Sequence, residues 1–370
     1  MRSLNKIVLE IFKRRRVGKG ELADILGLSR STISYFIAKL SKMGIVKVEK
    51  WNRGRGRPVE LVYIHPDRWR SLGVKVGREE VVGILFDALM GEIKRVEVAV
   101  SHDMRSDAGY SEILEDIFQR FEDDGIVAVG VGASGIVDGG RLESPILGVR
   151  SLDLISLMRS HFKGAIFEVV NDVEALALYE EFVHGGRRFL VINYGTGIGA
   201  AFYDGKLLRS KDRSIFQIGH VVVDPKGDRC YCGKRGCLET VASDYANLKR
   251  FLREKFTIEE FVEYEHERFE SDLERMRKLA RSGELDDVYS ESIEKLGLVL
   301  SNIVHMLEPE KVVIYGEGAF ERFVERLSSF VGNILRREID FECRCDEKDA
   351  VEKGLALSAV SKYISSGFRV

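Results

Sequence analysis

Apolar residues at the start of the chain recur at the spacing of amphipathic helices. Within residues 4–15 they stand three and four positions apart, which predicts a helix with one buried face. The residues on that face are Leu4, Ile7, Val8, Ile11 and Phe12. A second, short helix is predicted over residues 20–26, where Leu22 and Ile25 would be buried and Gly27 breaks the pattern.

A third helix is predicted from Arg30 to about Met43. Ser29 is a good N-cap for it, because a serine side chain accepts a hydrogen bond from a backbone amide of the first turn. Gly44 follows in the position that commonly ends a helix. The apolar face of this helix consists of Ile33, Phe36, Ile37 and Leu40.

Two short segments of alternating polarity follow, residues 45–50 and 59–64. Between them lies a glycine-rich stretch that carries arginines, which predicts a two-stranded hairpin with an exposed tip. Three helices followed by such a hairpin make a winged helix-turn-helix, so we expect this domain to span residues 1–65. Residues 66–70, which begin with a proline, are expected to form a linker.

From residue 71 to residue 370 the predicted strands and helices alternate, which favours an α/β body wrapped as two lobes. Residues 72–86 predict two strands of a hairpin. The other predicted strands are residues 126–131, 167–170, 190–202 and 311–314. The predicted helices are residues 110–123, 152–161, 172–182, 245–255, 290–307 and 350–365.

The composition agrees with a folded protein of more than one domain. At 370 residues the chain is too long for one ordinary core, and 45% hydrophobic residues with only 5 prolines indicate a globular chain rather than a disordered one. No stretch of about 18 apolar residues occurs, and the N-terminal segment lacks the apolar centre of a signal peptide. We therefore expect a cytoplasmic protein with no membrane partner.

The small net charge of -2 conceals two parts of opposite sign. Residues 1–70 contain 17 Lys and Arg against 6 Asp and Glu, whereas the rest of the chain contains 40 against 53. A basic segment on an acidic body is typical of a nucleic-acid-binding module joined to a partner domain. A basic face that is merely solvated would give the same counts.

The third predicted helix carries the side chains that we expect to read DNA. In a helix-turn-helix the second helix of the motif enters the major groove, and its first turns contact base edges. The candidates on this helix are Ser29, Arg30, Ser31, Thr32, Ser34 and Tyr35. The candidates in the wing tip are Arg53, Arg55 and Arg57, which suit a minor groove or a row of phosphates. The alternative is a winged domain that serves only protein contacts.

One histidine and three cysteines form the strongest local signal for chemistry. They are His220, Cys230, Cys232 and Cys237. This Cys₃His set suits a tetrahedral, structural Zn²⁺ ion. An odd number of cysteines without a secretion signal argues against a disulfide framework. The alternatives are buried free thiols and a DNA-binding zinc knuckle. Cys343 and Cys345 receive no role.

The spacing His-x₉-Cys-x-Cys-Gly-x-x-Gly-Cys-x-Glu, from His220 to Glu239, resembles the signature of the ROK family of repressors, open reading frames and sugar kinases. The resemblance extends over residues 71–370. Its other motifs are Gly130-Val-Gly-Ala-Ser-Gly-Ile-Val-Asp138, Asn171-Asp172, Gly195-Thr-Gly-Ile-Gly199 and Gly316-Glu-Gly318. A winged helix placed before this body is the layout of the transcriptional-repressor branch of the family.

The resemblance implies a two-lobed, actin-like (ribonuclease H-like) fold of the sugar-kinase type, with a sugar in the cleft. It also implies that the C-terminal helix returns to the first lobe. The implied sugar-binding residues are Asn171, Asp172, Gln217, His220 and Glu239. Family members usually have a glutamate where this chain has Gln217, so the sugar preference is expected to differ from that of the typical member.

In the kinases of the family, Asp172 would be the base that takes the proton from a sugar hydroxyl. The first phosphate loop departs from those kinases, because Lys75 stands at its aspartate position and Glu79 at its threonine position. A carboxylate beside ATP phosphates would repel them. We therefore expect no catalytic residue and a vestigial nucleotide loop, which consists of Gly195, Thr196, Gly197 and Gly199.

These features predict a sugar-responsive transcriptional regulator, a repressor of carbohydrate-utilisation genes. Its expected partners are operator DNA, a small sugar effector and further copies of itself in a dimer or tetramer, because helix-turn-helix proteins usually read two-fold operators. The alternative is an active ATP-dependent sugar kinase, of the glucokinase or N-acetylhexosamine kinase type, that also carries a DNA-binding module.

Overall fold

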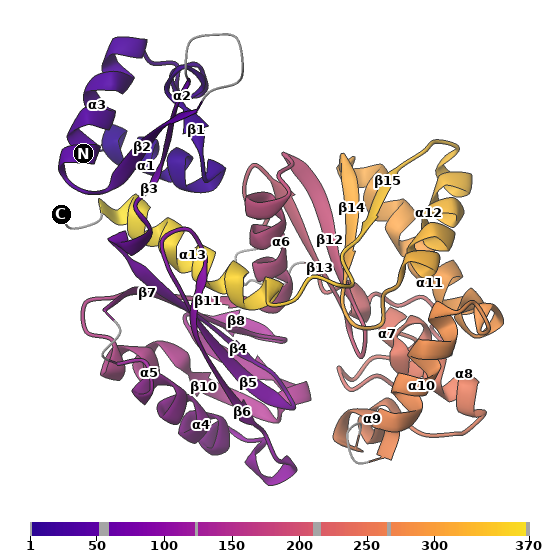
Figure 1. The fold of residues 1–370 in the computed structure, drawn as a ribbon. Coiled ribbons are helices and arrows are strands. Elements are labelled where there is room, and N and C mark those ends of the chain that lie inside the picture. The colour runs from indigo at the N-terminus through magenta and orange to yellow at the C-terminus, as the bar shows by residue number, and fades with distance from the viewer. Residues whose placement is uncertain (1, 52–58, 123–124, 210–215, 265–267, 368–370) are drawn as a thin grey trace.

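The computed structural model describes residues 2–51, 59–122, 125–209, 216–264 and 268–367. A small N-terminal domain sits on a larger body of two lobes, and the C-terminal helix runs from beneath the small domain to the region between the lobes (Figure 1). Over these described ranges, no helix has the length and apolar character needed to cross a bilayer. The wing tip, with Arg53, Arg55 and Arg57, lies outside the described residues.

The N-terminal domain has the three helices and the hairpin that the sequence predicts. Its elements are α1 (Arg2–Arg14), β1 (Val17–Gly18), α2 (Lys19–Leu26), α3 (Arg30–Lys42), β2 (Val46–Trp51) and β3 (Val59–Ile64). The strand order is β1-β3-β2, with antiparallel pairs. This order of three helices and a hairpin is that of a winged helix-turn-helix.

The predicted ends of α2 and α3 are confirmed. The Ser29 hydroxyl accepts a hydrogen bond from the Thr32 amide at 3.1 Å, while Gly27 and Gly44 adopt the left-handed conformation with φ of 63° and 67°. The prediction that Ile25 is buried is wrong, because its side chain is 37% exposed. Leu22 and Ala23 fill the buried face of this short helix instead.

The first lobe is built on a five-stranded sheet in the order β11-β7-β4-β5-β6. Its strands are β4 (Arg70–Val76), β5 (Glu80–Phe86), β6 (Glu92–Ala99), β7 (Ile126–Ala133) and β11 (Ile166–Asn171). The helices α4 (Asp107–Gln119) and α5 (Leu154–His161) belong to this lobe, as does a small sheet of β8 (Ile136–Asp138), β9 (Arg141–Ser144) and β10 (Val149–Asp153). The predicted 72–86 hairpin is confirmed as β4 and β5.

The second lobe is built on a four-stranded sheet in the order β13-β12-β14-β15. Its strands are β12 (Arg188–Tyr194), β13 (Ile198–Asp204), β14 (Lys311–Tyr315) and β15 (Asp340–Cys343). The prediction of one strand over 190–202 is wrong. The chain turns back between Tyr194 and Ile198, so that β12 and β13 pair antiparallel. The intervening Gly-Thr-Gly forms the bend between the two strands.

Eight helices among the described residues complete the body. They are α6 (Asp172–Val183), α7 (Leu238–Ala242), α8 (Asp244–Leu252), α9 (Ile258–Tyr264), α10 (Glu270–Arg281), α11 (Asp286–Leu307), α12 (Glu321–Leu335) and α13 (Ala350–Gly367). Of these helices, α7, α9, α10 and α12 are additions to those predicted from the sequence. Cys343 and Cys345 are partly buried against the core of the second lobe.

The C-terminal helix α13 packs so closely on the sheet of the first lobe that the backbones of the two are in contact. A Cβ atom added at Gly73 of β4 would lie 2.0 Å from the Glu352 carbonyl oxygen, and one added at Gly130 would lie 2.0 Å from that of Leu355. Only glycine permits this approach. The segment 66–70, predicted as a linker, contains a short 3₁₀ turn over Pro66–Arg68 and buries Trp69, which is 3% exposed.

Candidate functional site

The first turns of α3 present polar side chains to the solvent, away from the buried face of the helix. Ser29, Arg30, Ser31 and Ser34 are exposed, and the Tyr35 ring is 66% exposed, whereas Thr32 is half-buried. The Ser29 hydroxyl lies 2.8 Å from that of Ser31 and 2.7 Å from that of Thr32. Of the α3 residues predicted to read DNA, all but Thr32 are therefore exposed to solvent.

A concave surface beside α3 adds basic residues that the sequence analysis did not single out. Lys19 at the start of α2 and Lys50 of β2 line it together with Arg30 and Ser34. The Lys19 ammonium is 2.6 Å from the Glu60 carboxylate, which holds it beside β3. No local pattern predicts that the fold brings these basic residues next to Arg30, because the three residues come from three different elements.

The predicted metal ligands lie together in the second lobe. One donor atom from each of His220, Cys230, Cys232 and Cys237 lies within 4.8 Å of all the others, a group that can hold a metal ion. The Cys230 sulfur is 3.6 Å from His220 Nδ1, and the Cys232 and Cys237 sulfurs are 3.6 Å apart. Three sulfurs and an imidazole are the donor set of tetrahedral zinc sites.

The loop that carries these ligands depends on a glycine. Gly236 has φ of 64°, and an added Cβ would lie 1.4 Å from the Asp224 carbonyl oxygen. Burial raises the pKa of the Cys237 thiol to about 11 and lowers the pKa of His220. The neutral imidazole is the form that binds a metal, and the charge of a bound cation would favour the thiolates that burial alone disfavours.

Glu239 follows the last cysteine by two residues and lies in the buried helix α7. Its side chain is 4% exposed, and one carboxylate oxygen accepts a hydrogen bond from the Ile198 amide at 3.1 Å. The other oxygen accepts from the Tyr231 hydroxyl. Burial raises the pKa of this carboxyl group, while the two donated hydrogen bonds lower it.

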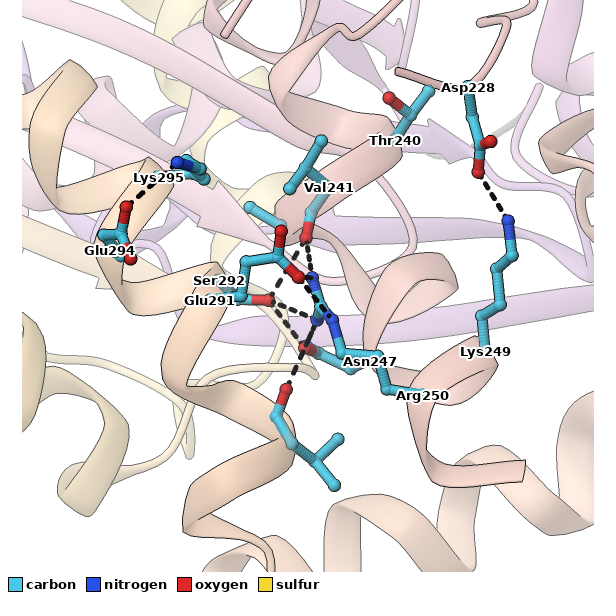
Figure 2. A network of polar contacts seen from close by, with 12 residues as sticks. Asp228, Thr240, Val241, Asn247, Lys249, Arg250, Glu291, Ser292, Glu294 and Lys295 are labelled. Carbon is cyan, nitrogen blue, oxygen red and sulfur yellow. Dashed lines mark hydrogen bonds and ion pairs between the residues drawn. The ribbon is translucent and has the colours of Figure 1, made fainter. Parts of the chain in front are cut away.

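Figure 2 shows how α7 is fixed to its neighbours. The Arg250 guanidinium donates to the Val241 carbonyl oxygen of α7, to Asn247 Oδ1 of α8 at 3.0 Å, and to Ser292 Oγ of α11 at 3.1 Å. Its Nε atom donates to the Glu291 carboxylate at 3.0 Å. One side chain thus cross-links three helices and restricts the movement of the helix that positions Glu239.

Asn171 and Asp172 lie where β11 ends and α6 begins. Asn171 caps the helix, because its Oδ1 accepts from the Val173 amide at 2.9 Å while its Nδ2 donates to the Gly135 carbonyl oxygen at 2.8 Å. Asp172 Oδ1 also lies 2.9 Å from the Val173 amide. Burial raises the pKa of Asp172, and the nearby Lys75 ammonium partly offsets that rise.

The start of β13 connects these two groups of residues. The Ile198 amide donates to Glu239, and a Cβ added at Gly199 would lie 2.6 Å from Val173 Cγ2 at the start of α6. The His220 ring meets the Tyr231 ring edge to face at 5.3 Å. Gln217, the fifth predicted sugar contact, is exposed at the start of a 3₁₀ turn over Ile218–His220.

A pocket of about 270 Å³ lies between the lobes and has Tyr231 in its wall. The first lobe contributes Arg78, His102 and Arg105, and the second lobe contributes Glu259 and Glu263. Arg105 Nη1 reaches the Glu263 carbonyl oxygen across the gap at 3.4 Å. The sequence did not predict this set, because its members are dispersed over separate loops and share no spacing.

The glycine loop at the β12–β13 turn has acidic neighbours. The Asp244 amide donates to the Gly195 carbonyl oxygen at 3.0 Å, and a Cβ added at Gly318 would lie 2.8 Å from the Asp244 carboxylate. Arg277 pairs with Asp244 at 2.6 Å and with Glu317 at 2.9 Å. An ion pair of Asp244 and Arg277 therefore lies beside a loop that would hold phosphates in a kinase.

Comparison with known proteins adds relatives along the whole chain. The xylose repressor of Caldicellulosiruptor bescii is 25% identical over 391 residues, covering 99% of this chain and 96% of that protein. The xylose repressor of Bacillus subtilis is 28% identical, covering 83% and 80%. The DNA-binding transcriptional dual regulator NagC of Escherichia coli is 24% identical, covering 81% and 77%.

Two solved structures have the same fold. A ROK family transcriptional regulator described as a homologue of the E. coli MLC protein superposes with a TM-score of 0.72 at 21% identity, covering 98% of this chain and 96% of that one. The ROK hexokinase from Thermus thermophilus superposes with a TM-score of 0.61 at 22% identity, covering 79% and 98%.

Family models match both parts of the chain. Residues 3–47 match the winged helix-turn-helix DNA-binding model, and residues 71–354 match the ROK family model. The fold predicted from the sequence is therefore confirmed, and the chain is a member of the ROK family with an N-terminal winged helix-turn-helix domain.

Proposed function

We propose that this protein is a sugar-responsive transcriptional repressor that binds operator DNA through its winged domain and a small sugar in its body. The observation that carries the proposal is the combination, in one chain, of an exposed polar α3 face with a buried carboxylate site beside a metal-binding loop. Relatives that cover most of the chain are named as repressors of xylose and N-acetylglucosamine systems, which makes these two sugars the first probes.

The sugar site consists of side chains that suit hydroxyl groups. Asp172 and Glu239 accept hydrogen bonds from sugar hydroxyls, and His220 adds a ring nitrogen. Asn171 caps α6 and fixes the backbone that carries Asp172. Gln217 is exposed near His220 and offers a neutral amide, so it contacts only a sugar large enough to reach it.

The metal in this proposal is a structural Zn²⁺ ion held by His220, Cys230, Cys232 and Cys237. Four protein donors leave no open position for a catalytic water. The ion holds the loop so that Tyr231 and Glu239 keep their positions, in the way that neighbouring contacts orient groups around metal sites. Its chemistry is confined to this structural role.

The same structure argues against phosphoryl transfer. Lys75, which stands where the kinases of the family have an aspartate, is half-buried at the end of β4, and its ammonium lies near Asp172 and Glu352. Asp244 and Glu317 flank the Gly195 loop. Asp172 therefore acts as a hydrogen-bond acceptor for the sugar and not as a catalytic base.

A thermal-shift screen of the purified protein with xylose, N-acetylglucosamine and glucose tests the proposal, followed by gel-shift titration with DNA that the protein selects from a random pool. A sugar that binds only the native state raises the melting temperature. The same sugar is expected to change DNA affinity. Turnover of ATP with that sugar in a coupled assay would contradict this proposal and show that the protein is a sugar kinase.

A further inference from the structure

The first helix of the winged domain contacts the second lobe through the end of α6. The Phe12 and Phe182 ring centroids are 5.1 Å apart, and the Arg15 guanidinium lies 4.9 Å from the Phe182 ring centroid. Lys13 pairs with Glu181 at 3.0 Å, and both side chains are at most 30% exposed. These contacts are partly buried and combine apolar packing with charge, so they define one relative position of α1 and α6.

The same helix also contacts the first lobe. Phe12 meets the buried Trp69 ring edge to face at 5.9 Å, and Trp69 in turn meets Tyr363 of α13 at 6.2 Å. Asn5 Nδ2 donates to the Ser365 carbonyl oxygen at 3.5 Å. Since α13 packs on the sheet of the first lobe, α1 is attached to both lobes, with Phe12 between the two sets of contacts.

The two supporting helices meet at the seam between the lobes. α6 packs on the sheet of the second lobe, with Leu176 and Tyr179 in a cluster that includes Val191 of β12. A Cβ added at Gly354 of α13 would lie 2.0 Å from the Ala175 carbonyl oxygen of α6. The helices therefore touch backbone to backbone near their first turns, which leaves no room for them to move closer there.

Helix α6 thus forms a rigid connection. Its first residues lie in the candidate sugar site, and its last turn contacts the winged domain. Asn171 caps α6 at one end, and Phe182 lies in its last turn. The eight residues from Ala175 to Phe182 span about 10 Å at about 1.5 Å per residue. A rotation of one lobe about the Gly354–Ala175 contact would displace Phe182 relative to Tyr363. Helix α1 contacts Phe182 directly and is connected to Tyr363 through Trp69.

We propose that α1 is the element that senses the lobe arrangement: its contact with Phe182 and Glu181 transmits sugar-induced movement of α6 to the winged domain. This inference rests on the proposed function. Sugar that changes the arrangement of the two lobes changes the angle between α6 on the second lobe and α13 on the first, and α1 cannot keep both sets of contacts when that angle changes. The orientation of α3 then changes with α1, because both helices share the core of the winged domain.

The test measures the ratio of DNA affinity without and with sugar, using xylose and N-acetylglucosamine as probes and a DNA duplex that the full chain selects from a random pool. Typical allosteric couplings give the parent a ratio of about 5–150. Phe182→Ala is expected to bring the ratio close to one. Lys13→Glu should lower it at least threefold, and the exchange Lys13→Glu with Glu181→Lys should restore it.

Arg209→Glu is the matched control. Arg209 pairs with Glu174 on the same helix at 2.7 Å, with exposures of 31% and 18% that resemble the 30% and 20% of the Lys13–Glu181 pair, yet it does not involve α1. This variant should keep the parent ratio. Calorimetric titration with the sugar should give similar affinity for all variants in the absence of DNA.

Two failures are distinguishable. A parent protein that binds neither sugar, or that binds one without any change in DNA affinity, overturns the proposed function and the inference with it. If sugar changes the DNA affinity of the parent, but neither Phe182→Ala nor Lys13→Glu changes the ratio of affinities, the inference alone is overturned. Since the charge pair is partly exposed, Lys13→Glu remains decisive even where Phe182→Ala fails to fold.

Discussion

The hydroxyl of Tyr231 donates a hydrogen bond to the buried carboxylate of Glu239. Tyr231 stands between two of the candidate metal ligands, Cys230 and Cys232, and its ring also forms part of the pocket between the lobes. The loop of the candidate metal ligands therefore contacts the candidate sugar site through this side chain. Any displacement of the loop changes the position or the protonation of Glu239.

Removing this hydroxyl tests the connection. Tyr231→Phe leaves a buried carboxylate oxygen without its donor, and a hydrogen bond to a charged group contributes about 1.5–3 kcal/mol. Sugar affinity in calorimetric titration should fall about 10-fold or more, while the zinc content stays that of the parent. Tyr35→Phe, which alters an exposed ring in the winged domain, is the control and should leave sugar affinity intact. Equal affinities for parent and Tyr231→Phe would contradict the connection.

The metal site is tested by metal analysis. The purified protein should contain about one zinc per chain, and Cys232→Ser should lose most of it, because three donors hold zinc far less tightly than four. The melting temperature should fall at the same time. Cys345→Ser changes a cysteine outside the group of four and should retain the metal. Full zinc occupancy in Cys232→Ser would exclude this ligand set.

The charge of Asp172 is expected to be necessary for the response to sugar. Asp172→Asn keeps the size of the side chain but removes the stronger acceptor, so sugar affinity should fall by about 10-fold or more. DNA binding without sugar should remain near that of the parent. Gel-shift titrations with and without sugar measure both effects. A variant that still releases DNA at the parent's sugar concentration would show that the sensor lies elsewhere.

Two basic residues of the winged domain should affect DNA binding differently. Arg30 lies on the exposed face of α3, so Arg30→Ala should relax sequence preference and cost about 1–3 kcal/mol on the best site. Lys50 lies beside it on β2, where a phosphate contact is expected. Lys50→Ala should weaken binding to all sequences alike and reduce the salt dependence. A selection experiment on both variants distinguishes these outcomes. If Lys50→Ala alters the selected sequence, its assignment to phosphates is wrong.

Stability should depend on pH through Glu352 at the start of α13. Burial raises the pKa of this carboxyl group, so the folded protein holds the proton more tightly than the unfolded chain does. The resulting contribution to stability is present at acidic pH and is lost as the pH rises through the folded-state pKa. Glu352→Gln does not titrate, so its melting temperature relative to the parent should increase from pH 4.5, the ordinary value for Glu, to pH 8. A constant or shrinking difference would contradict this assignment.

The local sequence patterns correctly predicted those helix ends that depend on residues close by in the chain. Ser29, Gly27 and Gly44 marked the helix ends of the winged domain, because capping depends on neighbouring backbone groups. The histidine and cysteine spacing predicted a group that can hold a metal ion, because these residues lie in one short stretch of the chain. The 190–202 segment shows the limit of such patterns. Both strands are apolar, so the pattern predicted one strand that included the Gly-Thr-Gly turn between them.

The sequence by itself determined the winged domain, the two-lobed fold and the candidate donor set for a metal ion. Only the tertiary structure decided that Ile25 is exposed, that Tyr231 donates to Glu239, and that Phe12 lies between Phe182 and Trp69. The contacting residues are separated by 8 to 170 positions or lie on different elements, and no periodicity relates them. Their contacts follow from the packing of complete helices and sheets, where shape and burial decide which side chains meet.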